Sequence, residues 1–136
     1  MLKKEFTYTD YDGNTQTETA YFNMTKAEIA AMQVKMDGKY SDHIKALVAG
    51  EHVEQLFNIF RELVLDSYGK KSEDGRRFVK NPDLRADFEA SIPFSDMLID
   101  LLSSPDKMSA FTKSILPPDM VTNGGEVNAL PGITVN

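Results

Sequence analysis

One amphipathic segment between Glu51 and Asp83 constrains the fold more than any other part of the sequence. Its apolar residues recur at spacings of three and four, which places them on one face of a helix. This face comprises Val53, Leu56, Phe57, Phe60, Leu63, Val64 and Ser67. The opposite face is polar and comprises Glu54, Asn58, Arg61, Glu62 and Asp66. Because no other segment carries as much aromatic and branched apolar surface, we expect this helix to be the centre of the core.

The residues after this helix predict where it stops and where the next helix begins. Gly69 stands where a left-handed C-terminal stop is expected. Asp74-Gly75 indicates a turn within a polar loop. Asn81-Pro82 then offers an N-cap residue followed by proline at the first helical position.

The N-terminal segment has the period of β-strands. From about residue 3 to residue 22, threonines and aromatic residues alternate on either side of Asp12-Gly13, which is a common hairpin turn. Phe6 and Tyr8 share one face of the first strand. We expect a β-hairpin, which must pack on the helices or pair with another chain because two strands alone are marginally stable.

Several further helices are expected after the hairpin. Thr25 and Glu28 form a capping box, followed by a buried stripe of Ile29, Met32 and Met36. A short helix is expected over residues 41–49, with Gly50 either separating it from the central helix or kinking one longer helix. Two more helices are expected to begin at Pro93 and at Ser104-Pro105.

These elements predict an α+β fold that is mostly α-helical, with an N-terminal β-hairpin and about five or six helices. The expected organisation is one domain over residues 1–117 and a flexible C-terminal tail over residues 118–136, where no helical period survives. Isolated apolar residues in that tail would allow it to dock on a partner.

Composition and motifs argue against most enzymatic and metal-binding classes. The chain has no cysteine, which excludes disulfides and thiolate metal sites. The segment from Asp10 to Asn14 resembles the start of a calcium loop, but the glycine and glutamate required later in that loop are absent. Gly69-Lys70-Lys71-Ser72 lacks the preceding glycine of a phosphate loop. His43 and His52 fall in no common register, so we expect no metal, no cofactor and no catalytic residue.

Net charge and hydropathy also limit the classes of partner that the chain could bind. The net charge is −6, which disfavours nucleic acid as a partner because duplex-binding proteins offset phosphate repulsion with a basic face. No apolar run approaches the ~18 residues of a membrane span, and the N-terminus turns directly into a strand pattern rather than a signal peptide.

One basic cluster stands out in this acidic chain. Around Phe78 it comprises Lys70, Lys71, Arg76, Arg77 and Lys80. It would contact RNA or an acidic protein surface. The alternative is a solvated loop whose cations face the negative end of the central helix and nearby carboxylates such as Asp66, Glu73 and Asp74.

Two stretches together resemble a known family. FTYTDYDGNTQTETAYFNMTKAEI (6–29) and SYGKKSEDGRRFVK (67–80), followed by a polar helix and the segment 94–98, are similar to the tail assembly chaperones of long-tailed, siphovirus-like bacteriophages and prophages of Gram-positive bacteria. The similarity runs from about residue 4 to residue 117. Ile92-Pro93 departs from the pattern, where a more polar pair is expected.

The resemblance implies a largely helical protein that works in the cytoplasm of the infected cell and is absent from the mature virion. Such proteins are expected to bind the tape measure protein, a long helical rod, and to help recruit tail tube protein around it. A ribosomal frameshift adds a C-terminal extension in many such phages, and the stretch after Pro117 is where short and extended products would diverge.

For this role we expect a helix-accepting groove between the central helix and the last two helices. Methionine and aromatic residues suit such adaptable surfaces. The expected lining residues are Tyr68, Phe78, Met97, Leu101, Met108 and Phe111. Two rival functions remain open, a structural tail-completion or connector protein of the virion and a small nucleic-acid-binding regulator. Self-association into a ring or a filament is compatible with each reading.

Overall fold

The computed structural model describes residues 1–36, 46 and 49–117. In chain order its elements are β1 (Leu2–Thr9), β2 (Thr15–Phe22), α1 (Lys26–Met36), α3 (Val53–Ser67), β3 (Tyr68–Lys71), β4 (Phe78–Val79), α4 (Pro82–Glu89), α5 (Ile92–Leu102) and α6 (Pro105–Ser114). The predicted helix over residues 41–49 falls mostly outside the described residues, and the predicted flexible tail falls wholly outside them. The predicted α+β class is confirmed.

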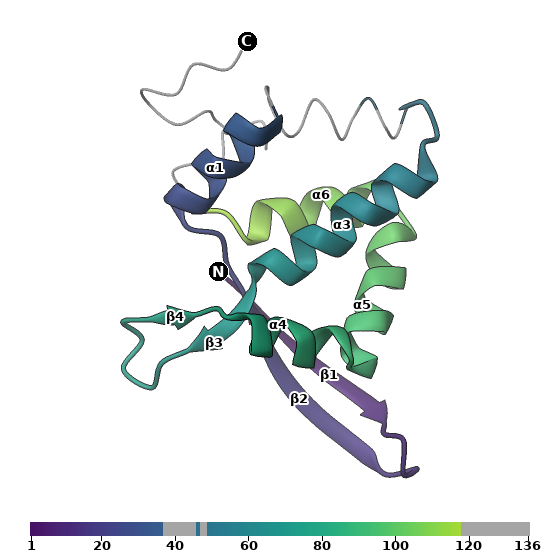
Figure 1. Cartoon of the computed structure of the whole chain (residues 1–136). Helices are drawn as coiled ribbons and strands as arrows, with labels where there is room; N and C mark the ends of the chain where they lie inside the picture. The colour runs from purple at the N-terminus through teal and green to yellow at the C-terminus, as the bar shows by residue number, and fades with distance from the viewer. Residues whose placement is uncertain (37–45, 47–48, 118–136) are drawn as a thin grey trace.

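The four strands form one antiparallel sheet in the order β1-β2-β3-β4. The predicted hairpin is confirmed, with pairs running from Leu2↔Phe22 to Thr9↔Thr15. β3 joins β2 only at its base, through the pairs Tyr21↔Gly69 and Phe22↔Tyr68. The two hairpins therefore share a base and extend from it in different directions (Figure 1).

The second hairpin was not predicted. Residues 68–79 were expected to form a helix end and a polar loop, but β3 and β4 pair at Lys70↔Val79 and Lys71↔Phe78. Short, charged strands lack the apolar alternation that identifies a strand in sequence. Their pairing depends instead on the neighbouring strand β2, which lies far away in the sequence.

The predicted helix starts are confirmed by their side-chain caps. Thr25 Oγ1 accepts from the Glu28 amide at 3.2 Å, and the Thr25 amide donates to Glu28 Oε1 at 2.9 Å. Asn81 and Ser104 accept from the amides three residues later, at 2.9 Å and 3.2 Å. α5 begins at Ile92, one residue earlier than expected, and Pro93 lies in its first turn, where the missing amide hydrogen is not needed.

The hydrophobic core lies where α3, α5 and α6 meet the base of the sheet. Its largest fully buried side chains include Phe22, Ile29, Phe60, Met97 and Ile115. Phe22 contacts the rings of Tyr68, Phe88 and Phe111, with centroids 5.6–6.0 Å apart. These aromatic contacts join β2 to three later segments of the chain.

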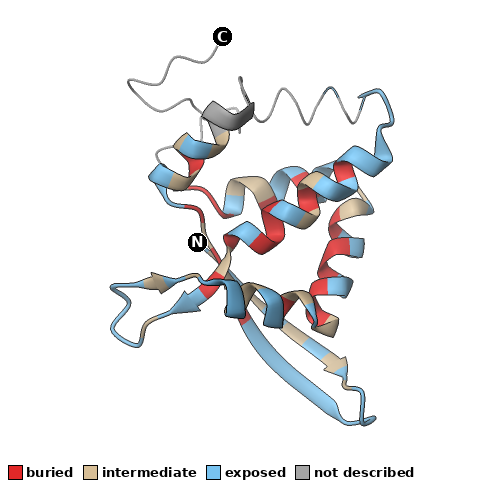
Figure 2. Ribbon diagram, viewed as in Figure 1, coloured by how far each residue is buried: buried red, intermediate tan, exposed pale blue. Residues whose placement is uncertain are grey.

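The predicted apolar stripe of α3 is confirmed except at two residues near its N-terminus. Its buried members are Leu56, Phe60, Leu63, Val64 and Ser67, and Leu65, which the predicted stripe omitted, is buried as well. Val53 and Phe57 were expected in the core but are 71% and 39% exposed. Most residues in the first turns of α3 are exposed (Figure 2), and among them only Leu56 reaches the core.

The prediction that Gly69 ends α3 in a left-handed conformation is also wrong. Among the described glycines, only Gly13 and Gly75 have positive φ. α3 ends because Tyr68 takes an extended backbone, and Gly69 follows within β3. A Cβ atom at Gly69 would lie 2.6 Å from the Phe78 ring and 2.8 Å from the Val79 carbonyl oxygen. Glycine is required here by close packing between β3 and β4.

Candidate partner-binding surfaces

Four of the six residues predicted to line a groove lie inside the core. Met97 and Leu101 of α5 and Met108 and Phe111 of α6 are all buried. α5 packs against both α6 and α3, and all four side chains belong to the single hydrophobic core, which leaves them no open face. They therefore do not line a surface groove in this structure.

The other two predicted groove residues, Tyr68 and Phe78, are half-buried. The Tyr68 ring stacks on Phe88, with centroids 4.2 Å apart and planes 6° from parallel. Burial and the nearby carboxylates of Asp87 and Glu18 raise the pKa of the Tyr68 phenol. Phe78 packs over the Cα atom of Gly69. Both rings thus support the junction between the sheet and the helices.

The structure separates the predicted basic cluster into an outward group and one inward residue. Lys70 and Lys71 lie on β3 and Arg76 and Arg77 at the turn of the second hairpin, and all four are exposed. This outward group, residues Lys70, Lys71, Arg76 and Arg77, is called the basic hairpin below. Lys80 follows β4 and turns toward the body of the molecule.

The turn of the basic hairpin is held by its own side chains. Asp74 accepts from Ser72 Oγ at 2.7 Å and from the Arg76 amide at 3.0 Å. Ser72 Oγ also accepts from the Arg77 amide at 3.0 Å. The hydrogen bonds from Ser72 and Arg76 lower the pKa of Asp74. The turn backbone is therefore ordered without using the guanidinium group of Arg76.

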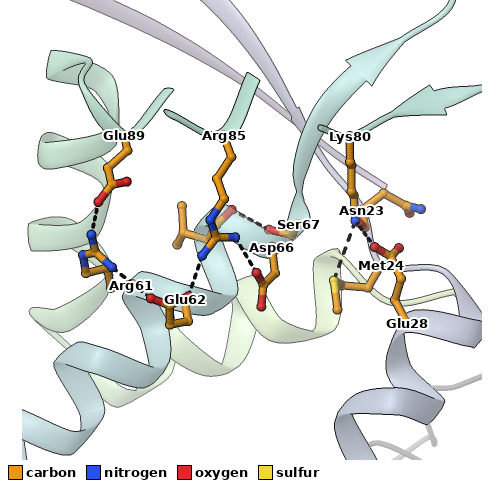
Figure 3. A network of polar contacts seen from close by, with 11 residues as sticks. Asn23, Met24, Glu28, Arg61, Glu62, Asp66, Ser67, Lys80, Arg85 and Glu89 are labelled. Carbon is orange, nitrogen blue, oxygen red and sulfur yellow. Dashed lines mark hydrogen bonds and ion pairs between the residues drawn. The ribbon is translucent and has the colours of Figure 1, made fainter. Parts of the chain in front are cut away.

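Lys80 joins the second hairpin to the segment between β2 and α1 (Figure 3). Its Nζ atom donates to the Asn23 carbonyl oxygen at 2.7 Å and to Glu28 Oε2 at 2.7 Å. Burial opposes ionisation of Glu28, but hydrogen bonds from Lys80 and Thr25 outweigh it, so the pKa of Glu28 lies below its ordinary value. We refer to Lys80, Asn23 and Glu28 as the Lys80 junction.

Backbone hydrogen bonds fix the same segment from two other directions. The Asn23 amide donates to the Ser67 carbonyl at the end of α3, at 2.8 Å. The Met24 amide donates to the Ile115 carbonyl after α6, also at 2.8 Å. Residues 23 and 24 thus connect the sheet to α3, α6 and the second hairpin. This convergence involves segments more than 90 residues apart, so sequence spacing gave no sign of it.

A network of ion pairs joins α3 to α4 (Figure 3). Arg85 pairs with Glu62 and Asp66, each at 2.5 Å. Arg61 pairs with Glu62 at 2.9 Å and also with Glu89. The polar face predicted for the central helix therefore holds α4 in place instead of facing only water.

An open cavity of about 320 Å³ lies between this network and the Lys80 junction. It is lined by Met24, Glu28, Leu65, Asp66, Tyr68, Lys80, Asn81 and Arg85. Its charged groups are already paired with one another. These two ion pairs hold the second hairpin and α4 to neighbouring segments of the domain.

Other candidate sites have structural explanations. Asp10, at the start of the sequence that resembles a calcium loop, accepts from Gln16 Nε2 at 2.8 Å and from the Asn14 amide at 2.8 Å, which lowers its pKa. In the described part of the chain, no three acidic or histidine side chains cluster as metal ligands would. His43 lies outside the described residues. Among the helices described, none is both long and apolar enough to cross a bilayer.

The exposed apolar residues are the sites that sequence reasoning missed. Val53 and Phe57 lie one turn apart on α3, and Ile99 on α5 is 66% exposed. The periodic pattern marked Val53 and Phe57 as apolar helix positions but could not tell a covered turn from an uncovered one. A single exposed apolar residue such as Ile99 is ordinary on a protein surface, whereas the adjacent pair Val53 and Phe57 is a candidate for contact with a partner.

Comparison with known proteins identifies the family. The model of a family described as phage tail assembly chaperone matches residues 1–130. No curated protein and no solved structure matches the chain. Because the match covers nearly the whole chain, it does not rest on one local motif. The chain belongs to the phage tail assembly chaperone family, a family of non-enzymatic assembly factors.

Proposed function

We propose that the protein binds the tape measure protein during tail assembly, keeps this long helical rod soluble and helps recruit tail tube protein to it. It does so in the cytoplasm of the host cell and is absent from the mature virion. The proposed setting is a long-tailed phage or prophage of a Gram-positive bacterium. Membership of the family supports tail proteins as partners.

The observation that carries this proposal is the uncovered end of the α3 stripe. Val53 and Phe57 continue the apolar face that Phe60 and Val64 bury in the core. Residues four apart lie on one helix face, so the two exposed side chains present a single apolar ridge. A helix of the partner that packed on this ridge would extend the core beyond its present edge.

The expected gain from covering this ridge is moderate. Fully burying a valine or phenylalanine side chain contributes roughly 1.5–3 kcal/mol, and Phe57 is already partly covered. Contact at the ridge would therefore contribute a few kcal/mol before the costs of association, which suits reversible binding by a chaperone.

Co-expression with the tape measure protein of the same phage tests the proposal. The wild-type chain is expected to co-purify with it and to increase its soluble fraction. The double variant Val53→Gln/Phe57→Gln is expected to lose most of this effect, whereas Ile99→Gln, which removes an exposed apolar residue elsewhere, is the matched control. If the wild type neither binds nor solubilises the tape measure protein, the partner is wrong. If wild type binds and the double variant binds equally well, the α3 ridge is not the contact surface.

Mass spectrometry of purified virions tests the proposed location. A chaperone is expected to be missing from finished particles but present in lysates of infected cells. Detection at a fixed number of copies per virion would favour the rival function of a structural tail component.

A further inference from the structure

Several cations among the described residues form ion pairs with carboxylates. Arg61, Lys80, Arg85 and Lys107 pair with carboxylates. Within the described residues, the four cations of the basic hairpin form no ion pair. Their charges are thus available to a partner.

The basic hairpin is also distinct in its position. It extends from the sheet base away from the helices (Figure 1). Lys71 lies over the Tyr21 ring at 5.9 Å and donates to the Ser72 carbonyl at 3.3 Å, which restricts its motion. At the turn, Ser72 and Asp74 order the backbone around Arg76 and Arg77. A projecting element with ordered backbone and unpaired cations loses little conformational freedom when it binds anions.

We propose that the basic hairpin binds an acidic segment of the protein partner that the chaperone holds. Arginine side chains match the geometry of carboxylates, with which they form paired hydrogen bonds. This inference rests on the proposed function for the identity of the partner and adds a second, electrostatic contact to the apolar one on α3.

The charge pattern favours a polypeptide over nucleic acid. Residues 70–77 hold four cations but also Glu73 and Asp74, in a chain of net charge −6. A phosphate backbone is a continuous line of negative charge, and it would be repelled by these two carboxylates and by the acidic body of the molecule. Acidic side chains on a polypeptide are spaced apart and can meet the cations while avoiding Glu73 and Asp74.

The test uses the full chain and the double variant Arg76→Gln/Arg77→Gln. Apart from one contact between the Arg77 guanidinium and the Arg76 carbonyl, the turn is held by backbone atoms, Ser72 and Asp74, so the variant should keep its fold. The matched control, Lys3→Gln/Lys113→Gln, removes two positive charges elsewhere. Circular dichroism and thermal melting verify the fold of each variant.

Two binding measurements are made at about 50 mM and about 500 mM salt, because screening weakens contacts between exposed charges. The first uses the tape measure protein, and the second uses a labelled decaglutamate peptide, with a single-stranded RNA of equal charge as competitor. At low salt the arginine variant is expected to bind decaglutamate about tenfold more weakly than wild type, with little change in the lysine control. Its affinity for the tape measure protein should fall in the same way.

The outcomes separate this inference from the proposed function. If wild type and the arginine variant bind the tape measure protein equally, the basic hairpin is not a contact, although the proposed function stands. If wild type does not bind the tape measure protein, the proposed function fails, and the decaglutamate measurement alone decides the inference. Tight, salt-sensitive and arginine-dependent binding of decaglutamate supports the inference. Absence of binding overturns the inference. RNA that binds more tightly than decaglutamate would overturn the inference in favour of a nucleic-acid site.

Discussion

Replacing Lys80 with methionine would test whether the Lys80 junction holds the sheet to α1. Methionine keeps much of the length and apolar stem of the lysine but removes its charge and its hydrogen bonds. Lys80 Nζ donates to the Asn23 carbonyl at 2.7 Å and to Glu28 at 2.7 Å, and the lysine side chain is only 23% exposed. The variant therefore leaves a backbone carbonyl and a carboxylate without their shared donor.

The expected loss of folding stability in Lys80→Met follows from these contacts. A hydrogen bond from a charged donor contributes about 1.5–3 kcal/mol, whereas the ion pair with partly exposed Glu28 adds less than 1 kcal/mol after solvent screening. Part of this stabilisation is recovered in the variant because water can reach Glu28, so we expect the free energy of unfolding to fall by about 2 kcal/mol. For a domain of this size that corresponds to a fall of roughly 6–10 °C in the melting temperature.

Urea denaturation followed by circular dichroism gives the free energy of unfolding directly. Lys107→Met is the matched control, because Lys107 pairs with Asp100 at 2.6 Å but both side chains are about half exposed. An exposed pair contributes about 0–1 kcal/mol, so the control should lose much less than the Lys80 variant. A double-mutant cycle with Glu28→Gln should yield a coupling energy of about 0.5–1 kcal/mol. Equal losses in the two lysine variants would refute the reasoning.

Four further predictions address single features of the fold. Gly69→Ala should destabilise by at least about 2 kcal/mol in urea denaturation, because its Cβ would lie 2.8 Å from the Val79 oxygen. A loss below about 1 kcal/mol would contradict this. Thr25→Ala should cost about 1 kcal/mol through loss of the α1 cap, and Thr25→Ser, which retains the hydroxyl, should recover most of it. A hydrogen bond to Glu18 raises the pKa of Tyr8 to about 12, so ultraviolet titration of Glu18→Gln should show the Tyr8 phenol ionising at lower pH. A Tyr8→Phe background should remove that change and leave only the smaller effect of Glu18 on Tyr68. The pKa of Glu28 is lowered on folding, so the ionised Glu28 side chain stabilises the fold fully above the ordinary glutamate pKa, and this stabilisation is lost as pH falls through the lowered pKa. Across that acidic range, wild type should therefore lose more stability than Glu28→Gln.

Local signals in the sequence predicted much of the fold. The Asp12-Gly13 turn, the Thr25 capping box and the Asn81-Pro82 start all appear where expected. Each depends on hydrogen bonds or backbone preferences within a few residues, so neighbouring sequence contains the information required. The resemblance to tail assembly chaperones likewise agrees with the family match.

The candidate surfaces were predicted less well. The basic residues were identified, but not that Lys80 turns inward and leaves the other four exposed. The predicted groove residues on α5 and α6 are apolar at helical spacing, and this pattern is the same for a groove and for a core. Four of them belong to the core, because α5 packs on both α3 and α6 and their side chains join one buried cluster.

Short-range chemistry specifies where helices begin, where the first hairpin turns and which positions are apolar, so these features could be predicted from the amino-acid sequence. Which apolar positions are covered depends on the packing of the whole chain. This packing buried Phe60 and left Phe57 on the surface, although both belong to one stripe. It also placed Gly69 in a strand against Phe78 and brought Lys80 to Asn23. Burial and close approach depend on segments distant in the chain, and no local pattern specifies where those segments stop covering one another.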